Sequence, residues 1–270
     1  MKLANVQLVV TDMDGTLLNS KGEVSTRFFE LFEELSSYGV HFVAASGRQY
    51  QSILSKLDLI KDKLIVIAEN GGIAMQGDHQ LLINTLRPDE LSNFIDPLRN
   101  ITHTHLILCG KKGAYIENPT EEFIPILHKY YYSVTIVNDL KKVTDDVFLK
   151  LACYHMHNSE QHLYPSLKKF KGLYQIKVSD EKWLDISHLN AHKGNALKQV
   201  QQELGISPEQ TMVFGDYNND IEMLRQGYFS YAMKNAHPNV IKTARFQTQS
   251  NDKFGVEIIL ESVLRAKKGI

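Results

Sequence analysis

The chain has 270 residues and a formal net charge of −1, with 43% hydrophobic and 23% charged residues. This composition is ordinary for a globular protein with a sizeable core, and the near-zero charge does not indicate a nucleic-acid or anionic-membrane partner. The two cysteines, Cys109 and Cys153, are too few and too far apart in sequence for a disulfide framework or a cysteine-based zinc site. No apolar run approaches transmembrane length, and the first one ends at Asp12 before a signal peptide is complete. We therefore expect a cytoplasmic protein without a membrane or nucleic-acid partner.

An apolar run over 6–11 ends in two carboxylates, Asp12 and Asp14, followed by Gly15. The run predicts a buried parallel strand, and alternate side chains of an extended segment point the same way, so the two carboxylates begin on one face. A hard divalent cation such as Mg²⁺ would relieve their repulsion and attract phosphate oxygens. The same residues are also typical of an ordinary turn in which aspartate caps backbone amides. Both interpretations are open from these residues alone.

Helices and strands then alternate. Apolar spacing over 25–38 predicts a helix that packs on the core, and a strand over 40–45 leads into Ser46-Gly47-Arg48 at the start of another helix. A hydroxyl and free backbone amides at a helix N-terminus suit a phosphate, although Ser46 taken alone is more typical of a helix cap.

A third strand over 64–68 ends in the polar turn 69–72. Three strands separated by helices predict an α/β fold with a doubly wound, Rossmann-like parallel sheet. Ligands of such sheets bind beyond the carboxyl ends of the strands, where all three polar turns are expected to lie.

The pattern changes after about residue 84. A helix opens at Arg87-Pro88, and strands predicted over 104–108, 113–117 and 147–154 lie between helical segments. This rhythm differs from strict strand–helix alternation and predicts an inserted α+β domain.

Two pairs of histidines occur in this insert. His103 and His105, and His155 and His157, are two residues apart and are expected to share a strand face. Because no third ligand is evident nearby, we interpret them as structural or solvent-facing histidines rather than zinc ligands.

Two polar turns follow the insert. Lys193 opens a helix that ends at Gly205, and a lysine at this end is poorly placed for the helix dipole, which favours either a bound phosphate or a solvated side chain. The strand over 211–214 then ends in a turn that contains Asp216 and Asp220. In a parallel sheet this turn would lie at the same edge as Asp12 and could complete a metal site, although aspartate is also a common turn residue.

Four short motifs therefore occur in order: Asp12-Met13-Asp14-Gly15-Thr16, Ser46-Gly47-Arg48, Lys193-Gly194, and Gly215-Asp216 with Asn219-Asp220. Together they resemble the four ordered motifs of the haloacid dehalogenase (HAD) superfamily. The insert between the second and third motifs is similar to a type IIB cap, and Asn70-Gly71 together with the turns of the C-terminal tail is similar to the Cof-type sugar-phosphatase branch. The resemblance implies a HAD-like hydrolase core over 1–84 and 187–270, with a substrate-specificity cap over 85–186.

The resemblance also implies a Mg²⁺-dependent phosphatase that forms an aspartyl-phosphate. Asp12 would be the nucleophile, and Asp14 would protonate the leaving oxygen and then activate water. The implied metal ligands are Asp12, Asp14 and Asp216, with Asp220 close by in support. The residues implied to bind the phosphate are Met13, Ser46, Gly47, Arg48, Lys193 and Asn219.

The cap carries no recognisable motif, so the substrate stays open within the class of small phosphorylated molecules. Sugar phosphates, pyridoxal phosphate and nucleotide phosphates such as flavin mononucleotide are all compatible with the sequence, and the oligomeric state is not readable. Two alternatives remain, a sugar phosphomutase of the same superfamily and a non-catalytic phosphate-binding or sensing protein. The intact acidic and basic residues of the motifs favour an enzyme over the sensor.

Overall fold

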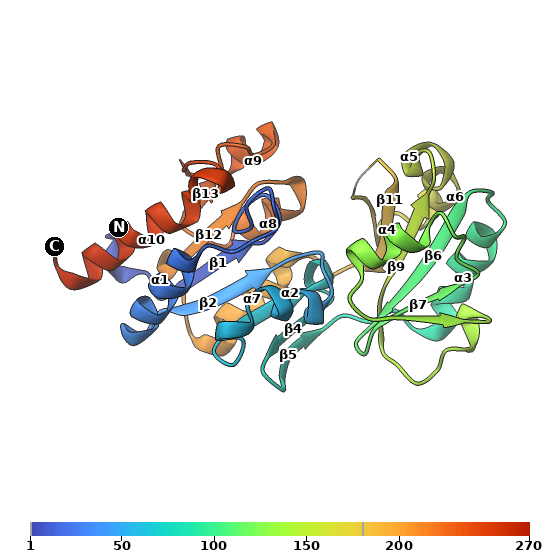
Figure 1. Cartoon of the computed structure of the whole chain (residues 1–270), viewed down its shortest axis with the longest axis horizontal. Helices are drawn as coiled ribbons and strands as arrows, with labels where there is room; N and C mark the ends of the chain where they lie inside the picture. Colours follow the sequence, from blue (N-terminus) through green and yellow to red (C-terminus); the bar gives the residue numbers. More distant parts are fainter. Residues whose placement is uncertain (1, 180) are drawn as a thin grey trace. The chain divides into compact units, whose positions relative to one another are not determined.

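The chain consists of two compact units, seen in the computed structural model in Figure 1, which describes residues 2–179 and 181–270. The first unit comprises Met1–Gly47, Ile53–Leu82 and His192–Ile270, and the second comprises Arg48–Ser52 and Ile83–Ala191. Within the described residues each unit is built on a sheet of its own. None of the described helices combines the length and the apolar composition needed to span a bilayer.

The sheet of the first unit is parallel over most of its width. Its strands are β1 (Leu8–Asp12), β2 (His41–Ala45), β3 (Ile65–Ala68), β4 (Ile73–Gln76), β5 (His79–Ile83), β12 (Thr211–Gly215), β13 (Phe229–Ala232) and β14 (Phe246–Gln247). They lie in the order β14-β13-β12-β1-β2-β3-β4-β5. The strand β1 is central and pairs in parallel with β2 on one side and β12 on the other, so the ends of these three strands meet at one edge.

The α-helices that accompany these strands are α1 (Thr26–Ser37), α2 (Tyr50–Lys56), α7 (Lys193–Leu204), α8 (Ile221–Leu224), α9 (Pro238–Thr243) and, after the last strand, α10 (Gly255–Lys268). The helix α1 begins as its sequence predicts, because the Ser25 hydroxyl accepts a hydrogen bond from the Phe28 N–H at 3.1 Å. Its apolar stripe, which includes Phe28 and Phe32, is buried. The predicted α/β fold class is confirmed.

The hairpin of β4 and β5 is not predicted by the sequence pattern. The strand β4 pairs antiparallel with β3, so the sheet is mixed at this edge. Gly77 adopts φ +55° between the two strands, a conformation that glycine tolerates well. The residues of β5 are exposed or half-buried, so the strand lacks the apolar run of a buried parallel strand.

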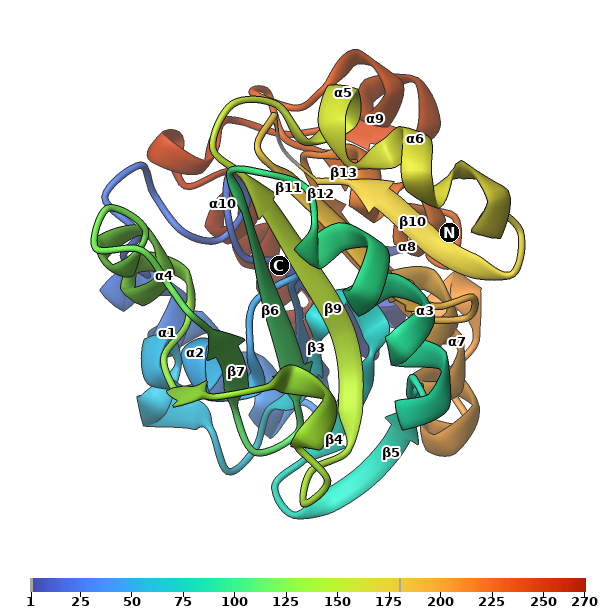
Figure 2. The ribbon, with the colours of Figure 1, turned by 90° about the vertical axis from the view of Figure 1, so that its right-hand side faces the viewer.

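The second unit has a largely antiparallel sheet. Its strands are β6 (Thr104–Gly110), β7 (Ala114–Glu117), β8 (Val134–Val137), β9 (Phe148–His155), β10 (Tyr174–Val178) and β11 (Trp183–His188). Its helices are α3 (Pro88–Arg99), α4 (Ile124–Tyr130), α5 (Ser159–His162) and α6 (Tyr164–Leu167). The strand order is β10-β11-β9-β6-β7-β8, and Figure 2 shows β6 and β9 side by side with α3 packed near them.

Each face of this second sheet has its own apolar core. Leu151 and Cys153 of β9 belong to the core that contains Phe94 of α3, whereas Ala152 belongs to the core that contains Phe123. This is the alternation expected of a strand buried on both faces. Cys109 lies in the second of these cores, so the two cysteines point to opposite faces of the sheet and cannot pair.

The histidine pairs of the insert differ from the prediction. His103 lies in the turn before β6 with φ +62°, and His157 follows the end of β9. Neither pair therefore lies within one strand, and the expected shared strand face is wrong. His105 stacks on Phe123 with ring centroids 4.1 Å apart, and His155 Nδ1 accepts backbone N–H groups, so these two buried rings have structural partners.

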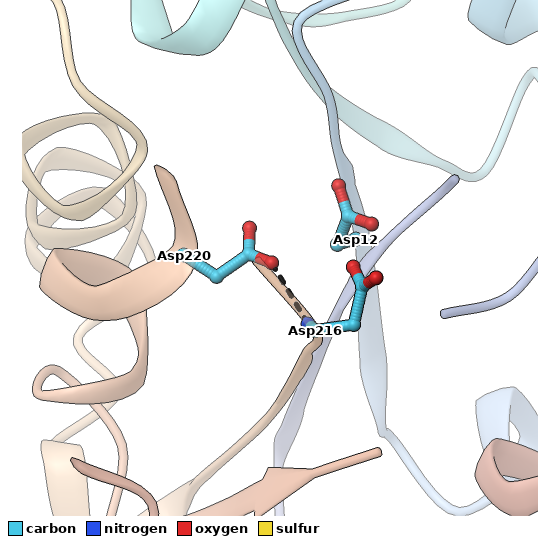
Figure 3. Close-up of side chains that lie close together, drawn as sticks. All are labelled: Asp12, Asp216 and Asp220. Carbon is cyan, nitrogen blue, oxygen red and sulfur yellow. Dashed lines mark hydrogen bonds between the residues drawn. The ribbon is translucent and has the colours of Figure 1, made fainter. Parts of the chain in front are cut away.

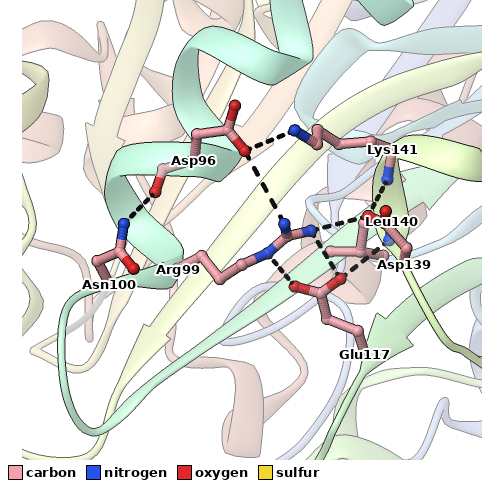
Figure 4. A network of polar contacts seen from close by, with 7 residues as sticks. All are labelled: Asp96, Arg99, Asn100, Glu117, Asp139, Leu140 and Lys141. Atoms are coloured by element: carbon pink, nitrogen blue, oxygen red, sulfur yellow. Dashed lines mark hydrogen bonds and ion pairs between the residues drawn. The ribbon is translucent and has the colours of Figure 1, made fainter.

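An ion-pair network ties α3 to β7 in the second unit (Figure 4). The Arg99 guanidinium donates to both Glu117 carboxylate oxygens, at 2.6 and 2.9 Å, and to Asp139 Oδ1 at 2.9 Å. Glu117 also accepts the backbone N–H of Leu140 at 3.0 Å. These hydrogen bonds raise the pKa of Arg99, and the one to Glu117 contributes most. The guanidinium therefore stays charged.

Candidate active site

Polar residues that follow parallel strands come together at the carboxyl edge of the first sheet. Asp12 ends β1, Ser46 follows β2 and Asp216 follows β12. The parallel pairing of β1 with both neighbours explains why residues far apart in sequence meet there. The candidate site therefore arises from sheet topology, as expected for a doubly wound fold.

Three carboxylates form the centre of this site (Figure 3). Asp12, Asp216 and Asp220 each place one carboxylate oxygen within 4.8 Å of the other two. Asp12 is only 5% exposed, and Asp220 is fully buried. Carboxylates this close and this poorly solvated repel one another unless a cation compensates them.

Lys193 supplies part of that compensation. Its Nζ donates to Asp12 Oδ1 at 2.5 Å and to Asp220 Oδ1 at 2.8 Å, and the side chain is fully buried. Burial opposes the charge on this lysine, but the two carboxylates outweigh that effect and raise its pKa above the ordinary value. The lysine at a helix start, which the dipole disfavours, therefore serves as the counter-ion of two aspartates.

The pKa values of Asp12 and Asp216 are displaced upward. Burial raises the pKa of Asp12 well above its usual range, and the neighbouring Asp220 and Asp216 add to this effect, while Lys193 opposes it. Burial, together with Asp220, also raises the pKa of Asp216 to about 6. Lys193 thus offsets only part of the negative charge, and the cluster still favours an additional cation.

Asp220 has a distinct set of contacts. One oxygen meets Lys193, and the other accepts the backbone N–H groups of Asp216 and Tyr217 at 3.0 and 3.1 Å. Both oxygens thus hold neighbouring parts of the site, and the arrangement fixes the turn that carries Asp216.

Gly15 lies against this turn. Its φ is +78°, and a Cβ at this position would lie 2.3 Å from Asp216 Oδ2. The adjacent Thr16 hydroxyl donates to Asp216 Oδ1 at 3.2 Å. Only glycine satisfies both the backbone conformation and the close approach, so the loop after β1 packs directly on the Asp216 carboxylate.

Ser46 and Gly47 form a second part of the site. Ser46 is buried, and its carbonyl accepts the N–H of Asn70 at 2.9 Å. The Asn70 amide is close to Gly47, where a Cβ would lie 2.9 Å from Nδ2, and its Oδ1 accepts from Asn219 Nδ2 at 3.1 Å. Asn70 therefore links the Ser46 and Asn219 loops, a role that its position in a polar turn does not reveal.

The remaining predicted residues have different environments. Asp14 is exposed, and its charge contributes to the raised pKa of Asp216. The side chain of Met13 is buried and its carbonyl accepts from Leu18 at 2.8 Å, so only its N–H is suited to a phosphate. Arg48 groups with the second unit, where its Nη1 lies 3.4 Å from Ser52 Oγ.

The chemistry of the cluster fits a hard divalent cation. All three carboxylates offer oxygen ligands, and burial together with the neighbouring acidic groups raises the pKa values of Asp12 and Asp216, which a dication would lower. A site with sulfur or imidazole ligands would suit a softer metal, and the three members of this cluster are all aspartates.

The fold and this site define a class of hydrolase. Residues 9–260 match the family model of the haloacid dehalogenase-like hydrolases. The chain therefore belongs to this family, and the resemblance inferred from the four motifs is confirmed, as is the enzyme class of hydrolase.

Individual relatives cover nearly the whole chain. It is 30% identical over 268 residues to the 5-amino-6-(5-phospho-D-ribitylamino)uracil phosphatase YbjI of Escherichia coli, with 97% of each chain covered. It is 26% identical to the phosphatase YcsE of Bacillus subtilis, which has the same activity in its name, with 93% of each covered. The crystal structure of SMU.1108c from Streptococcus mutans has 28% identity and a TM-score of 0.86, covering 96% of this chain and 99% of that one. The HAD subclass IIB sugar phosphatase BT4131 shares the fold at 20% identity and a TM-score of 0.78, with 95% and 98% covered.

Proposed function

We propose that this chain is a Mg²⁺-dependent phosphatase that hydrolyses phosphate monoesters of small metabolites through an aspartyl-phosphate on Asp12. The observation that carries the proposal is the contact between Lys193 Nζ and Asp12 Oδ1 at 2.5 Å, beside two further carboxylates. A carboxylate nucleophile needs cationic groups nearby, because it attacks a phosphoryl group that is itself negatively charged.

In the first step Asp12 attacks phosphorus, and the bond between phosphorus and the ester oxygen breaks. Asp14 donates a proton to that leaving oxygen, a role that its exposed position permits. In the second step Asp14 takes a proton from water, which attacks phosphorus and releases the Asp12 carboxylate together with inorganic phosphate. Atoms and charge balance over the two steps, and the enzyme returns to its starting state.

The phosphoryl oxygens would be held by donors around Asp12. Lys193 supplies a buried ammonium, and the Ser46 hydroxyl and the backbone N–H of Gly47 lie in the loop after β2. The backbone N–H of Met13 is the part of that residue available to a phosphate. Arg48 and Asn219 complete the proposed set. Preorganised donors of this kind stabilise the charge that develops in the transition state.

Asp12, Asp216 and the Asp14 backbone carbonyl would hold the Mg²⁺. When bound, the ion would neutralise the carboxylates and the phosphoryl oxygens and so lower the barrier to attack. Because both Asp220 oxygens already contact Lys193 and backbone amides, we propose that Asp220 supports the site rather than contacting the ion directly.

The relatives indicate which leaving group to test first. YbjI and YcsE carry the name of a phosphoribitylaminouracil phosphatase, so we place 5-amino-6-(5-phospho-D-ribitylamino)uracil at the head of the candidate substrates. Sugar phosphates, pyridoxal phosphate and flavin mononucleotide follow. We propose that the inserted domain, 85–186, selects among them.

The test is a panel of these phosphate monoesters, with released inorganic phosphate as the readout and kcat/KM measured with Mg²⁺ and with EDTA. Asp12→Asn should reduce kcat to well below a tenth of the wild-type value, since a barrier increase of about 1.4 kcal/mol already gives tenfold. Asp62→Asn, at an exposed position of the same unit, is the control. Wild-type turnover that is unaffected by EDTA would refute the metal, and formation of an isomeric sugar phosphate instead of free phosphate would indicate a mutase.

A further inference from the structure

The turn after β13 contacts both loops that carry the central aspartates. Asn235 Nδ2 donates to the Gly15 carbonyl at 2.8 Å, in the loop that follows Asp14. On its other side the same turn donates from the His237 N–H to the Asp216 carbonyl at 2.8 Å. A short segment near the end of the chain therefore lies between the two acidic loops.

A second turn reinforces the first. The Asn251 N–H donates to Asn235 Oδ1 at 3.3 Å, and Asn251 Nδ2 donates to the Leu18 carbonyl at 2.9 Å. Both functional atoms of the Asn235 amide are thus used, one toward Gly15 and one toward Asn251. The two asparagines form a connected chain of hydrogen bonds that begins and ends on the backbone of the loop after β1.

We propose that Asn235, supported by Asn251, is a positioning residue that fixes the loop bearing Asp14 relative to the loop bearing Asp216. Asn235 is exposed, and an exposed hydrogen bond contributes little to the stability of the fold, so we expect its removal to have little effect on the free energy of unfolding. Its effect falls on geometry instead: Gly15 packs against the Asp216 carboxylate, so a small shift of the Gly15 carbonyl moves the acidic groups apart.

The chemistry requires a donor at this position. An aspartate has the size of asparagine and still accepts the Asn251 N–H, but its ionised carboxylate cannot donate to the Gly15 carbonyl. Asn235→Asp and Asn235→Ala differ in charge and shape and share the loss of this one donor. An effect common to both variants therefore reports the hydrogen bond.

Kinetics form the first arm of the test, and this arm rests on the phosphatase function proposed above. Both variants should lower kcat on the best phosphate monoester by about tenfold or more, with KM within about threefold and Tm within about 3 °C of wild type. Asn100→Asp and Asn100→Ala are matched controls, because the exposed Asn100 Nδ2 also donates to a backbone carbonyl, that of Asp96, at 3.0 Å. Variants of Asn235 with wild-type kcat would overturn the proposal.

Hydrogen exchange forms the second arm and needs no substrate. Mass spectrometry should show faster amide exchange in peptides that cover residues 13–20 of both Asn235 variants, with α10 unchanged. Unchanged exchange over residues 13–20 would overturn the proposed positioning role of Asn235, whatever the kinetics show. If the wild type hydrolyses no phosphate ester, the proposed function fails. The hydrogen-exchange measurement then still decides whether Asn235 positions the loop after β1.

The double variant Asn235→Ala/Asn251→Ala tests whether the two residues act together. If the two residues act through one chain of hydrogen bonds, the kcat of the double variant should lie within about threefold of that of the worse single variant. The second substitution then removes a chain of hydrogen bonds that the first has already broken. If the fold-losses in kcat of the two single variants instead multiply in the double variant, the two residues act independently.

Discussion

Lys193 Nζ and Asp12 Oδ1 lie 2.5 Å apart in the interior of the first unit, and both side chains are almost inaccessible to solvent. Each group would be costly to bury alone, and each makes the burial of the other tolerable. The contact joins the first helical residue of α7 to the last residue of β1, which are 181 positions apart in sequence. It therefore couples the integrity of the fold to the chemistry proposed for the site.

Replacing Lys193 with methionine should cost both stability and turnover. The change leaves Asp12 and Asp220 buried without their counter-ion, which we expect to lower the free energy of unfolding by about 3–5 kcal/mol at pH 7. The pKa of Lys193 is raised, so the lysine is charged and contributes at every pH below about 10. The deficit of the variant should narrow as the pH falls, because protonation of the buried Asp12 carboxylate, whose pKa is raised, removes a charge that needs the counter-ion. Urea unfolding at a series of pH values measures this, with Lys198→Met, an exposed site of the same helix, as the control.

Replacing Gly15 with alanine should lower kcat strongly. The added Cβ would meet Asp216 Oδ2 at 2.3 Å, a contact that no L-residue accommodates without moving the carboxylate. Gly39→Ala is a matched control, because Gly39 has φ +73° and no atom within 4 Å of its would-be Cβ. Both variants bear the cost of a left-handed backbone, about 1 kcal/mol, but only Gly15→Ala should lower kcat, by about a hundredfold or more. Equal kcat values for the two variants would contradict the packing of Gly15 on Asp216.

The raised pKa of Asp216 predicts a pH dependence of stability in EDTA. Its folded-state pKa of about 6 exceeds the ordinary 3.8, so the folded protein holds the extra proton between these values and loses stability as pH rises through that window. Asp216→Asn removes this penalty and should be more stable than wild type by about 1–3 kcal/mol at pH 7.5, with no difference remaining near pH 3.5. Thermal unfolding across this range tests the sign, and a variant less stable than wild type at pH 7.5 would contradict it.

Added Mg²⁺ should make the wild type more stable than Asp216→Asn. A cation bound by the carboxylates stabilises the folded state by mass action, so Tm of the wild type should rise with Mg²⁺ concentration. Asp216→Asn lacks one proposed ligand and should respond weakly. An equal rise for both proteins would argue that Asp216 does not hold the ion.

The Arg99 network should affect stability without affecting chemistry. Arg99→Lys keeps the charge but loses the two-pronged contact with Glu117, so we expect a loss of about 1 kcal/mol in the free energy of unfolding and kcat within about twofold of wild type. Arg87→Lys, at a more exposed ion pair with Asp89, should cost less. A Tm for Arg99→Lys that matches wild type would show that the network adds little.

Local sequence signals predict the elements around the site well. The buried run before Asp12, the cap at Ser25 and the glycine after α7 each act over a few residues, and the structure has a strand, a helix start and a helix end there. Parallel strands bring their ends together by topology alone, so the proximity of Asp12 and Asp216 also follows from the sequence.

Features that depend on distant contacts are not readable in this way. The strands β5 and β8 have no buried residue, so neither has the burial pattern of an interior strand. Asn235 and Asn251 have no periodic signal at all, because their partners lie 220 and 233 residues earlier in the chain. The same reason hides the link between Asn70 and Asn219, which are 149 residues apart.

The central position of β1 has a consequence for biosynthesis. One edge of β1 pairs with β2, which the ribosome makes soon afterwards, but the other edge waits for β12, about 200 residues later. The stretch 83–191 is complete by then and can fold first as a unit, since domains generally fold as they emerge. A nascent chain therefore has no Lys193 beside Asp12 until most of the protein has been made. We expect chains that stop before β12 to expose an unpaired strand edge and to depend on chaperones until synthesis ends.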